Sequence, residues 1–155
     1  MQTDVVIFIG LQGAGKSTFY RERFAGTHVY VSRDRLRNNR RPRRREQELI
    51  REALAEGRSV VVDNTHPAAA DRAPVIALAR ESGARVIGYY FESRLEDCRE
   101  RNAAREGKER VPEVALYTTI NALEVPKPAE GFEELHYVRI AGGRFVVEDW
   151  INDEV

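Results

Sequence analysis

The stretch GLQGAGKST, residues 10–18, follows the apolar run DVVIFI at residues 4–9, and it decides the fold. It matches the pattern G-x-x-x-x-G-K-[ST], with Gly10, Gly15, Lys16 and Ser17 in the fixed positions. A strand before the loop and a helix after it are the usual setting of this motif. The sequence therefore predicts a phosphate-binding loop at the carboxyl end of the first strand.

The residue types of this loop suit a triphosphate. Glycines let backbone N–H groups close around phosphate oxygens where a side chain would collide, and the helix that starts near Lys16 directs the positive end of its dipole to the same point. Lys16 would reach the β- and γ-phosphates, and the Ser17 hydroxyl would ligate Mg²⁺. An incidental glycine-rich turn is the alternative. We expect ATP or another nucleoside triphosphate to bind at Gly13, Ala14, Gly15, Lys16, Ser17 and Thr18.

Strand-like and helical patterns alternate along the rest of the chain. Short, apolar, β-branched runs typical of buried strands lie at residues 27–31, 59–63, 85–91 and 134–140. Helical spacing predicts helices that end at Gly57, at Gly83 and near Gly107. This order predicts an α/β, three-layer P-loop NTPase or kinase fold, with a mostly parallel central sheet flanked by helices.

Two further elements are expected towards the C-terminus. Pro112 suits the first turn of a helix, whose buried stripe would be Val114, Tyr117, Ile120 and Leu123. The tail AGGRFVVEDW predicts a last, antiparallel strand after a Gly-Gly turn.

Length and composition limit the class of protein. The 155 residues suit a single domain, 1–155. Cys98 is the only cysteine, which excludes an intrachain disulfide and a cysteine-based zinc cluster, and the three histidines have no metal-ligand spacing. No signal peptide or membrane-spanning run is visible, so we expect a cytoplasmic protein with no membrane partner.

The stretch SRDRLRNNRRPRRRE, residues 32–46, holds eight arginines around Asp34, although the chain balances 25 basic against 25 acidic residues. Asp34 follows the second predicted strand, at the sheet edge where open α/β sheets bind ligands. A carboxylate kept ionised there by guanidinium groups can accept a proton from an attacking hydroxyl. A helix N-cap or a salt-bridge partner is the alternative role.

The arginines from Arg40 to Arg45 precede or begin a predicted helix, where cations oppose the helix dipole. The hypothesis is that this tract grips a phosphodiester backbone that leads toward Asp34. A solvated loop or a solubility device is the alternative. Binding by a phosphate clamp would fall steeply with salt.

Two more groups of residues suggest catalytic chemistry. Arg101 and Arg105 lie one helical turn apart, a repulsion that a transferring phosphoryl group would offset, unless Asp97 and Glu109 neutralise them on the surface. Asp63 ends the strand SVVVD, where P-loop proteins hold a carboxylate near Mg²⁺, and a plain Asp-Asn turn with Asn64 is the alternative.

In their order, these motifs resemble the kinase domain of the 5′-hydroxyl polynucleotide kinase family. The resemblance runs from about Val5 to Ile140 and includes GAGKSTF (13–19), the R-D-x-x-R pattern (33–37), VVVDNTHP (60–67), RNAAR (101–105), VPEVALY (111–117) and EVPKPAEGF (124–132). Gln12 and His66 depart from the family's usual proline and asparagine. No phosphatase domain fits in the chain.

The resemblance implies roles for individual residues. Asp34 would be the general base on the acceptor hydroxyl, and Arg37 would hold the acceptor's phosphate. Arg105 would be the lid arginine on the donor phosphates, in a lid region at about 101–112. The acceptor side would comprise Arg33, Arg37, Asp63 and Asn64, the donor side would include Arg101 and Arg105, and Mg²⁺ would bind at Ser17 and Asp63. A shift by one from Asp63 to Asn64 stays open.

The predicted function is ATP-dependent phosphoryl transfer to the 5′-hydroxyl end of RNA or DNA. One alternative is a small-molecule kinase that acts on a sugar or nucleoside hydroxyl with the same residues. Another is a nucleotide-gated RNA-binding module, in which replacing Asp34 by alanine would leave function intact. The sequence does not choose between RNA and DNA, and it does not assign a natural acceptor, a donor base or an oligomeric state.

Overall fold

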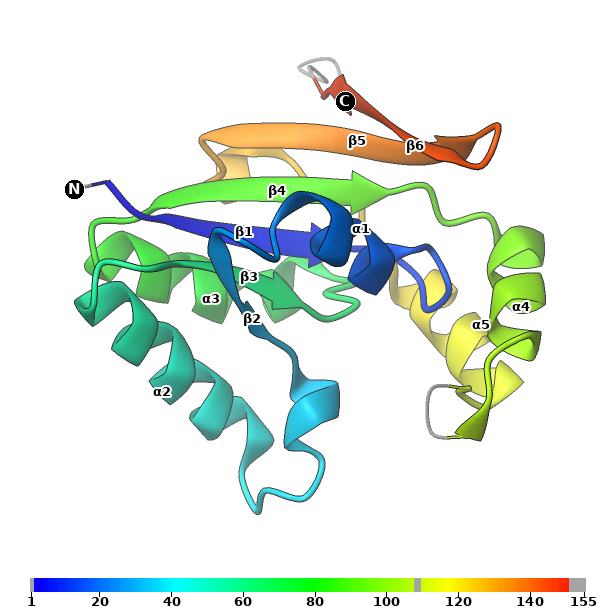
Figure 1. The fold of residues 1–155 in the computed structure, drawn as a ribbon, viewed down its shortest axis with the longest axis horizontal. Coiled ribbons are helices and arrows are strands. Elements are labelled where there is room, and N and C mark those ends of the chain that lie inside the picture. The colour runs from blue at the N-terminus through cyan, green and yellow to red at the C-terminus, as the bar shows by residue number, and fades with distance from the viewer. Residues whose placement is uncertain (1, 108–109, 151–155) are drawn as a thin grey trace.

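A computed structural model describes residues 2–107 and 110–150 (Figure 1). Its centre is a six-stranded sheet in the order β2-β3-β1-β4-β5-β6. The first five strands pair in parallel, and β6 pairs antiparallel with β5. The strands are β1 (Asp4–Ile9), β2 (His28–Val31), β3 (Ser59–Asp63), β4 (Arg85–Phe91), β5 (Glu134–Ala141) and β6 (Arg144–Asp149).

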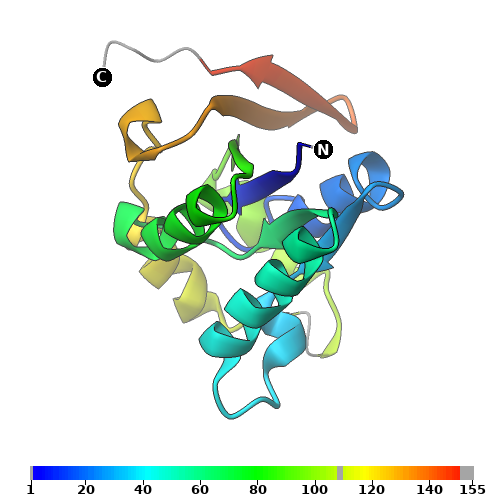
Figure 2. The same cartoon turned by 90° about the vertical axis from the view of Figure 1, so that its left-hand side faces the viewer.

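Helices cover both faces of this sheet. Buried residues of α2 and α3 pack on one face, and those of α1, α4 and α5 pack on the other. Figure 2 shows α2 and α3 along the same side of the sheet. The helices are α1 (Lys16–Arg23), α2 (Pro42–Ala55), α3 (Ala69–Glu81), α4 (Leu95–Ala103) and α5 (Glu113–Ala122), with the 3₁₀ helices η1 (Arg33–Leu36) and η3 (Pro128–Glu130). The predicted three-layer α/β fold with a mostly parallel sheet is confirmed.

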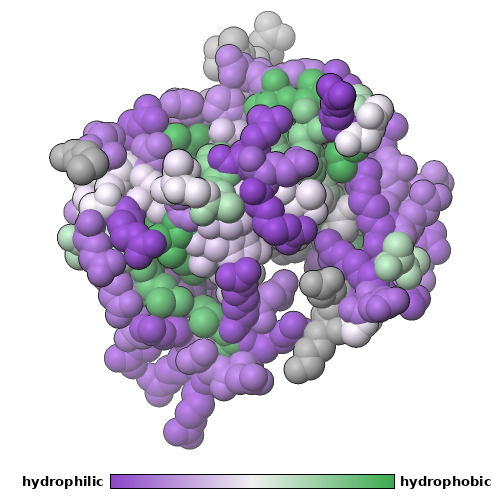
Figure 3. Space-filling model, in the orientation of Figure 1, coloured by the Kyte–Doolittle hydropathy of each residue, from purple (hydrophilic) through white to green (hydrophobic). Residues whose placement is uncertain are grey.

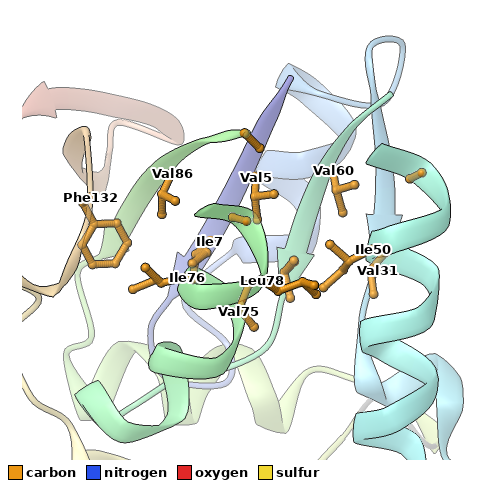
Figure 4. Close-up of a cluster of buried hydrophobic side chains, with 14 of the residues drawn as sticks. Val5, Ile7, Val31, Ile50, Val60, Val75, Ile76, Leu78, Val86 and Phe132 are labelled. Carbon is orange, nitrogen blue, oxygen red and sulfur yellow. The ribbon is translucent and has the colours of Figure 1, made fainter. Parts of the chain in front are cut away.

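Alternation along the central strand builds the two cores. Val5 and Ile7 face the helices α2 and α3 and contribute to the core with Ile50 and Val75 (Figure 4). Residues that alternate with them, such as Phe8, face the opposite layer. Because β1 is buried on both faces, its sequence is a continuous apolar run, as is typical of central parallel strands.

The second core is largely aromatic. Phe8, Phe19 and Phe91 pack around one another with ring centroids 5.1 to 5.8 Å apart and interplanar angles of 60° to 84°. Such inclined pairs place the positive ring edge on the negative ring face. Phe19 belongs to α1, so this cluster fixes the helix that follows the phosphate-binding loop against the sheet.

One sequence prediction about the core was wrong for two of its four residues. In the stripe of Val114, Tyr117, Ile120 and Leu123, the last two are partly buried against the cores, but Val114 and Tyr117 are 68% and 41% exposed. The helix α5 packs beside α4 and buries Leu116 instead, so its inner face is rotated from the predicted one.

The C-terminal hairpin follows the prediction. Gly142 and Gly143 connect β5 to β6 with φ of 58° and 74°, the left-handed region that glycine occupies without a steric penalty. None of the helices in the described ranges combines the length and apolarity needed to span a bilayer.

Candidate functional site

The loop between β1 and α1 has the conformation that a phosphate-binding loop needs. Gly13 and Gly15 have φ of 83° and 96°. A Cβ at Gly13 would lie 2.6 Å from the backbone oxygen of Cys98 in α4, and one at Gly15 would lie 3.0 Å from the ring of Phe145. Both glycines are therefore required by backbone angle and by space, and α4 supports the loop from behind.

Lys16 lies at the start of α1 and is 8% exposed. Its Nζ donates to the carbonyl oxygens of Gly10, at 2.7 Å, and Leu11, at 3.2 Å, so two of its three N–H donors cross the loop. Burial lowers the pKa of Lys16, and the negative charge of Asp63 opposes that shift. The ammonium group is thus held in place beside a carboxylate.

A cavity of about 440 Å³ opens beside the loop. It gathers residues from the ends of three strands, from α1 and from the segment after α4. Among the predicted site residues it is lined by Gly13, Lys16, Ser17, Thr18, Asp34, Arg37, Asp63, Asn64 and Arg105. Four others, Ala14, Gly15, Arg33 and Arg101, do not line it.

Asp34 lies in η1, directly after β2, and shares the cavity with Lys16. Ser32 is the N-cap of η1, and its hydroxyl oxygen accepts from the Asp34 N–H at 3.3 Å. Arg37 meets Asp34 through the backbone, with its Nε donating to the Asp34 carbonyl at 3.1 Å. Since Ser32 caps the helix, the alternative role of Asp34 as an N-cap does not apply.

Asp63 lies at the carboxyl end of β3 and is 7% exposed. Burial raises the pKa of its carboxyl, while Lys16 and a hydrogen bond from Tyr30 oppose the rise. The Tyr30 hydroxyl donates to Asp63 Oδ2 at 2.5 Å, and burial together with the carboxylate raises the pKa of Tyr30. No pattern in the sequence marks Tyr30 as a site residue, because tyrosines are common in buried strands.

Asn64 lines the cavity and also belongs to a buried polar network. Its Oδ1 accepts from the Arg33 N–H at 2.9 Å, and its Nδ2 donates to Glu46 Oε2 at 2.8 Å. Glu46 is 4% exposed and also lies 3.7 Å from Arg33 Nε. The network joins β3, η1 and α2, so it fixes the helix that carries Asp34.

His66 extends this network to the sheet. Its Nδ1 lies 2.8 Å from the Phe8 carbonyl oxygen, which makes Nδ1 the protonated nitrogen, and Nε2 can then accept from Asn64 at 3.3 Å. Burial lowers the pKa of His66 to about 4. Sequence reasoning gave no supporting role to His66 or Glu46, because the contacts of His66 with Phe8 and of Glu46 with Asn64 join residues that are far apart in the chain.

The two arginines of the predicted lid have different surroundings. Arg101 Nη1 donates to the Gly13 carbonyl at 3.1 Å, which braces the phosphate-binding loop from α4. Arg105 lines the cavity. Asn102 of α4 holds Val111 close to that helix, since its amide bonds both the N–H and the carbonyl of Val111 at 2.9 and 2.8 Å. Residues 108–109, which include the alternative partner Glu109, lie outside the described residues.

The donor set suits magnesium. Ser17 supplies a hydroxyl and Asp63 a carboxylate to the same cavity. Within the described ranges no three His, Cys, Asp or Glu side chains cluster as a metal cage. Magnesium usually keeps several waters and uses one or two carboxylates plus substrate phosphates, so a sparse oxygen set fits it.

A parallel sheet with a phosphate-binding loop after β1 and an acidic residue at the end of β3 defines a P-loop kinase domain. The chain belongs to the AAA domain family AAA_33, whose model matches residues 5–126.

The chain is also similar in sequence to part of a larger protein. The chain is 27% identical over 143 residues to a protein of Schizosaccharomyces pombe named "Bifunctional polynucleotide phosphatase/kinase". The match covers 87% of this chain and 33% of the relative, so the chain spans about a third of that protein's length.

Solved structures share the fold. A sugar kinase from Janibacter sp. HTCC2649 has a TM-score of 0.67 at 19% identity, with 88% of this chain and 85% of that chain covered. Kti12 from Chaetomium thermophilum, in complex with ADP-AlF3, has a TM-score of 0.68 at 17% identity, with coverage of 97% and 91%. Likeness at this identity concerns the fold alone.

Proposed function

We propose that this chain transfers the γ-phosphate of a magnesium-bound nucleoside triphosphate, with ATP as the donor, to the 5′-hydroxyl end of a polynucleotide. The observation that carries the proposal is the presence of Asp34 and Lys16 in the wall of one cavity. A phosphate-binding lysine and a separate carboxylate across the same space are what in-line transfer to a hydroxyl requires.

Three side chains of the cavity have defined tasks in the transfer step. Lys16 and the loop amides hold the β- and γ-phosphates, and Asp34 accepts the proton of the attacking hydroxyl. The bond from the acceptor oxygen to the γ-phosphorus forms as the bond to the β–γ bridging oxygen breaks. Arg105 balances the charge on the transferring group.

Ser17 and Asp63 would hold the magnesium ion, which neutralises phosphate charge when it is bound. The Tyr30 hydroxyl donates a hydrogen bond to Asp63 Oδ2. This bond holds the carboxylate in one orientation and does not involve its second oxygen, Oδ1. This fixed orientation favours Asp63 over its neighbour Asn64 as the metal-side residue, because the Asn64 amide is engaged with Arg33 and Glu46.

The polynucleotide acceptor is supported by two observations. Arg37 lines the cavity beside Asp34, where it can receive the phosphate that follows the terminal nucleoside. The curated relative bears the name of a polynucleotide phosphatase/kinase and aligns with 87% of this chain. Arg33 points its backbone N–H and its guanidinium to Asn64 and Glu46, so we assign it a supporting role on the acceptor side.

A small-molecule hydroxyl kinase is the second candidate, because a sugar kinase shares the fold. The experiment is transfer from γ-³²P-ATP to 5′-hydroxyl RNA, 5′-hydroxyl DNA, nucleosides and sugars. Labelling of oligonucleotide ends supports the proposal. Labelling of free sugars or nucleosides without oligonucleotides would support the second candidate instead.

A further inference from the structure

The cavity that contains Lys16 and Asp34 continues into an arginine-lined surface. Its wall shares Asp34 and Arg37 with a neighbouring hollow that also includes Arg41 and Arg44. Arg41 and Arg44 in turn line the next hollow, together with Asn39, Arg40, Arg45 and Glu48. The hollows share lining residues and so lie next to one another from Asp34 to the first turns of α2; together they are called here the arginine groove.

The arginine groove lies on a projecting part of the molecule. In Figure 1, η1 and the loop to α2 extend below the sheet, away from β4, β5 and β6. Figure 3 shows that the lower part of this face is covered by hydrophilic side chains.

Most of these arginines are not neutralised by the protein. Arg45 pairs with Glu48 and Glu52, each at 3.5 Å. Within residues 2–107 and 110–150, no carboxylate lies within 4.0 Å of Arg40, Arg41, Arg43 or Arg44, and these four side chains are exposed. Their guanidinium groups are thus available to an external anion.

The local placement of charge is unfavourable for the helix. The first turn of α2 contains no acidic residue, and its N-cap, Arg41, makes no side-chain cap hydrogen bond. Cations at a helix N-terminus oppose the dipole, and an anion at the same place is favourable. The chain contains 25 acidic residues, so a low acidic content does not account for their absence from this turn. Folding alone therefore does not explain the arrangement, whereas a bound polyanion does.

We propose that the arginine groove binds the phosphodiester backbone of the acceptor strand over several nucleotides beyond its 5′ end. Guanidinium groups bind phosphate oxygens through paired N–H donors, and successive arginines suit the repeating phosphates of a strand. A sugar or nucleoside would occupy the cavity alone. The inference rests on the proposed function for the end that is bound at Asp34, and it makes the acceptor a strand rather than a mononucleotide.

The test is direct binding, which does not require turnover. A 3′-labelled single strand of about 12 nucleotides, with a 5′-hydroxyl, is titrated with the full chain over a range of salt, in RNA and DNA forms. The groove variant is Arg41→Gln/Arg44→Gln. The matched control is Arg51→Gln/Arg58→Gln, which removes the same charge from positions outside the groove.

The groove variant is expected to bind at least tenfold more weakly than wild type. Its salt slope should be shallower by about 0.7 for each lost phosphate contact, the value for single strands. The control should match wild type in both affinity and slope. Equal loss in the two double variants, or no loss in either, would overturn the groove.

A second measurement separates this inference from the proposed function. With transfer assays on a dinucleotide and on the long strand, the groove variant should raise KM for the long strand only. Strand binding that depends on Arg41 and Arg44, without transfer to any end, would uphold the groove and refute the kinase. Transfer with the same KM for both acceptors in wild type and groove variant would refute the groove and leave the kinase standing.

Discussion

The Tyr30 hydroxyl donates a hydrogen bond of 2.5 Å to Asp63 Oδ2, and so one strand end fixes the carboxylate of the next. The bond stabilises the ionised carboxylate and opposes the effect of burial, which raises the pKa of Asp63. A metal ligand must be ionised at working pH. Tyr30 thus preserves the charge that Asp63 needs beside Lys16.

Removing this hydroxyl should make activity more sensitive to acid. In Tyr30→Phe the ring stays and the hydrogen bond is lost, so the pKa of Asp63 rises further. Because a larger fraction of Asp63 is then protonated at acidic pH, we expect kcat/KM to fall more at acidic pH than near pH 8, and the acidic limb of the pH profile to move to higher pH. The measurement is the pH profile of phosphoryl transfer. An unchanged acidic limb would exclude this role for Tyr30.

Glu46 should position Asp34 from a distance. Its carboxylate accepts from Asn64 and lies next to Arg33 in η1, and the charge is lost in Glu46→Gln. Small misplacements of a catalytic group cost roughly 100-fold at most, so we expect kcat to fall about 10-fold to 100-fold with little change in KM for ATP. Glu56→Gln, at an exposed residue that ends α2 outside the groove, is the control. Equal effects in both variants would argue for general loss of helix stability.

His66 should make the fold sensitive to acid. Its ordinary pKa is 6.5, and burial lowers it to about 4 in the folded chain. Between these values the unfolded chain binds a proton at this residue and the folded chain does not, so stability is full above pH 6.5 and falls as pH falls toward 4. At about 1.36 kcal/mol per unit, this residue should remove about 2 kcal/mol by pH 5.

The variant His66→Asn isolates that contribution. His66 has φ of 45°, a left-handed conformation that asparagine adopts more easily than most residues. Denaturant unfolding near pH 7 and near pH 5 should therefore show a smaller acid loss in the variant than in wild type. The same loss in both proteins would assign the acid sensitivity to other groups.

Substitution of Arg101 should affect ATP binding, whereas substitution of Arg105 should affect mainly the transfer step. Arg101 donates to the Gly13 carbonyl, so Arg101→Gln should loosen the loop and weaken ATP binding several-fold. Arg105 lines the cavity, so Arg105→Gln should lower kcat by roughly 100-fold with a smaller effect on ATP binding. Nucleotide titration and single-turnover transfer separate the two effects. A pure binding defect in Arg105→Gln would remove it from the chemical step.

The fold was predictable because its signals are local. The phosphate-binding loop has a fixed pattern, and the buried parallel strands are short continuous apolar runs. The inner face of α5 was not predictable, since Val114 and Leu116 are both apolar and only packing against α4 decides which is buried. Local apolar pattern gives the existence of a helix more reliably than its rotation.

The site was predictable only in part. Asp34 and Asp63 each follow a predicted strand, so their meeting at one sheet edge follows from topology. The supporting groups Tyr30 and Glu46 act through partners that are not their neighbours in the sequence, and no local pattern marks them. The hydrogen bond from Arg101 to the Gly13 carbonyl likewise could not be predicted, because it joins residues that are far apart in the sequence.

The role of Asp34 as general base is tested by single-turnover transfer from γ-³²P-ATP to a 5′-hydroxyl oligonucleotide. The variant is Asp34→Asn, with Asp97→Asn as the control. General-base catalysis contributes about 10²–10⁴-fold, so the Asp34 variant should lose at least 100-fold in the transfer rate while it retains ATP binding and fold. The control should transfer at the wild-type rate. Transfer by Asp34→Asn at the wild-type rate would show that this carboxylate does not activate the acceptor.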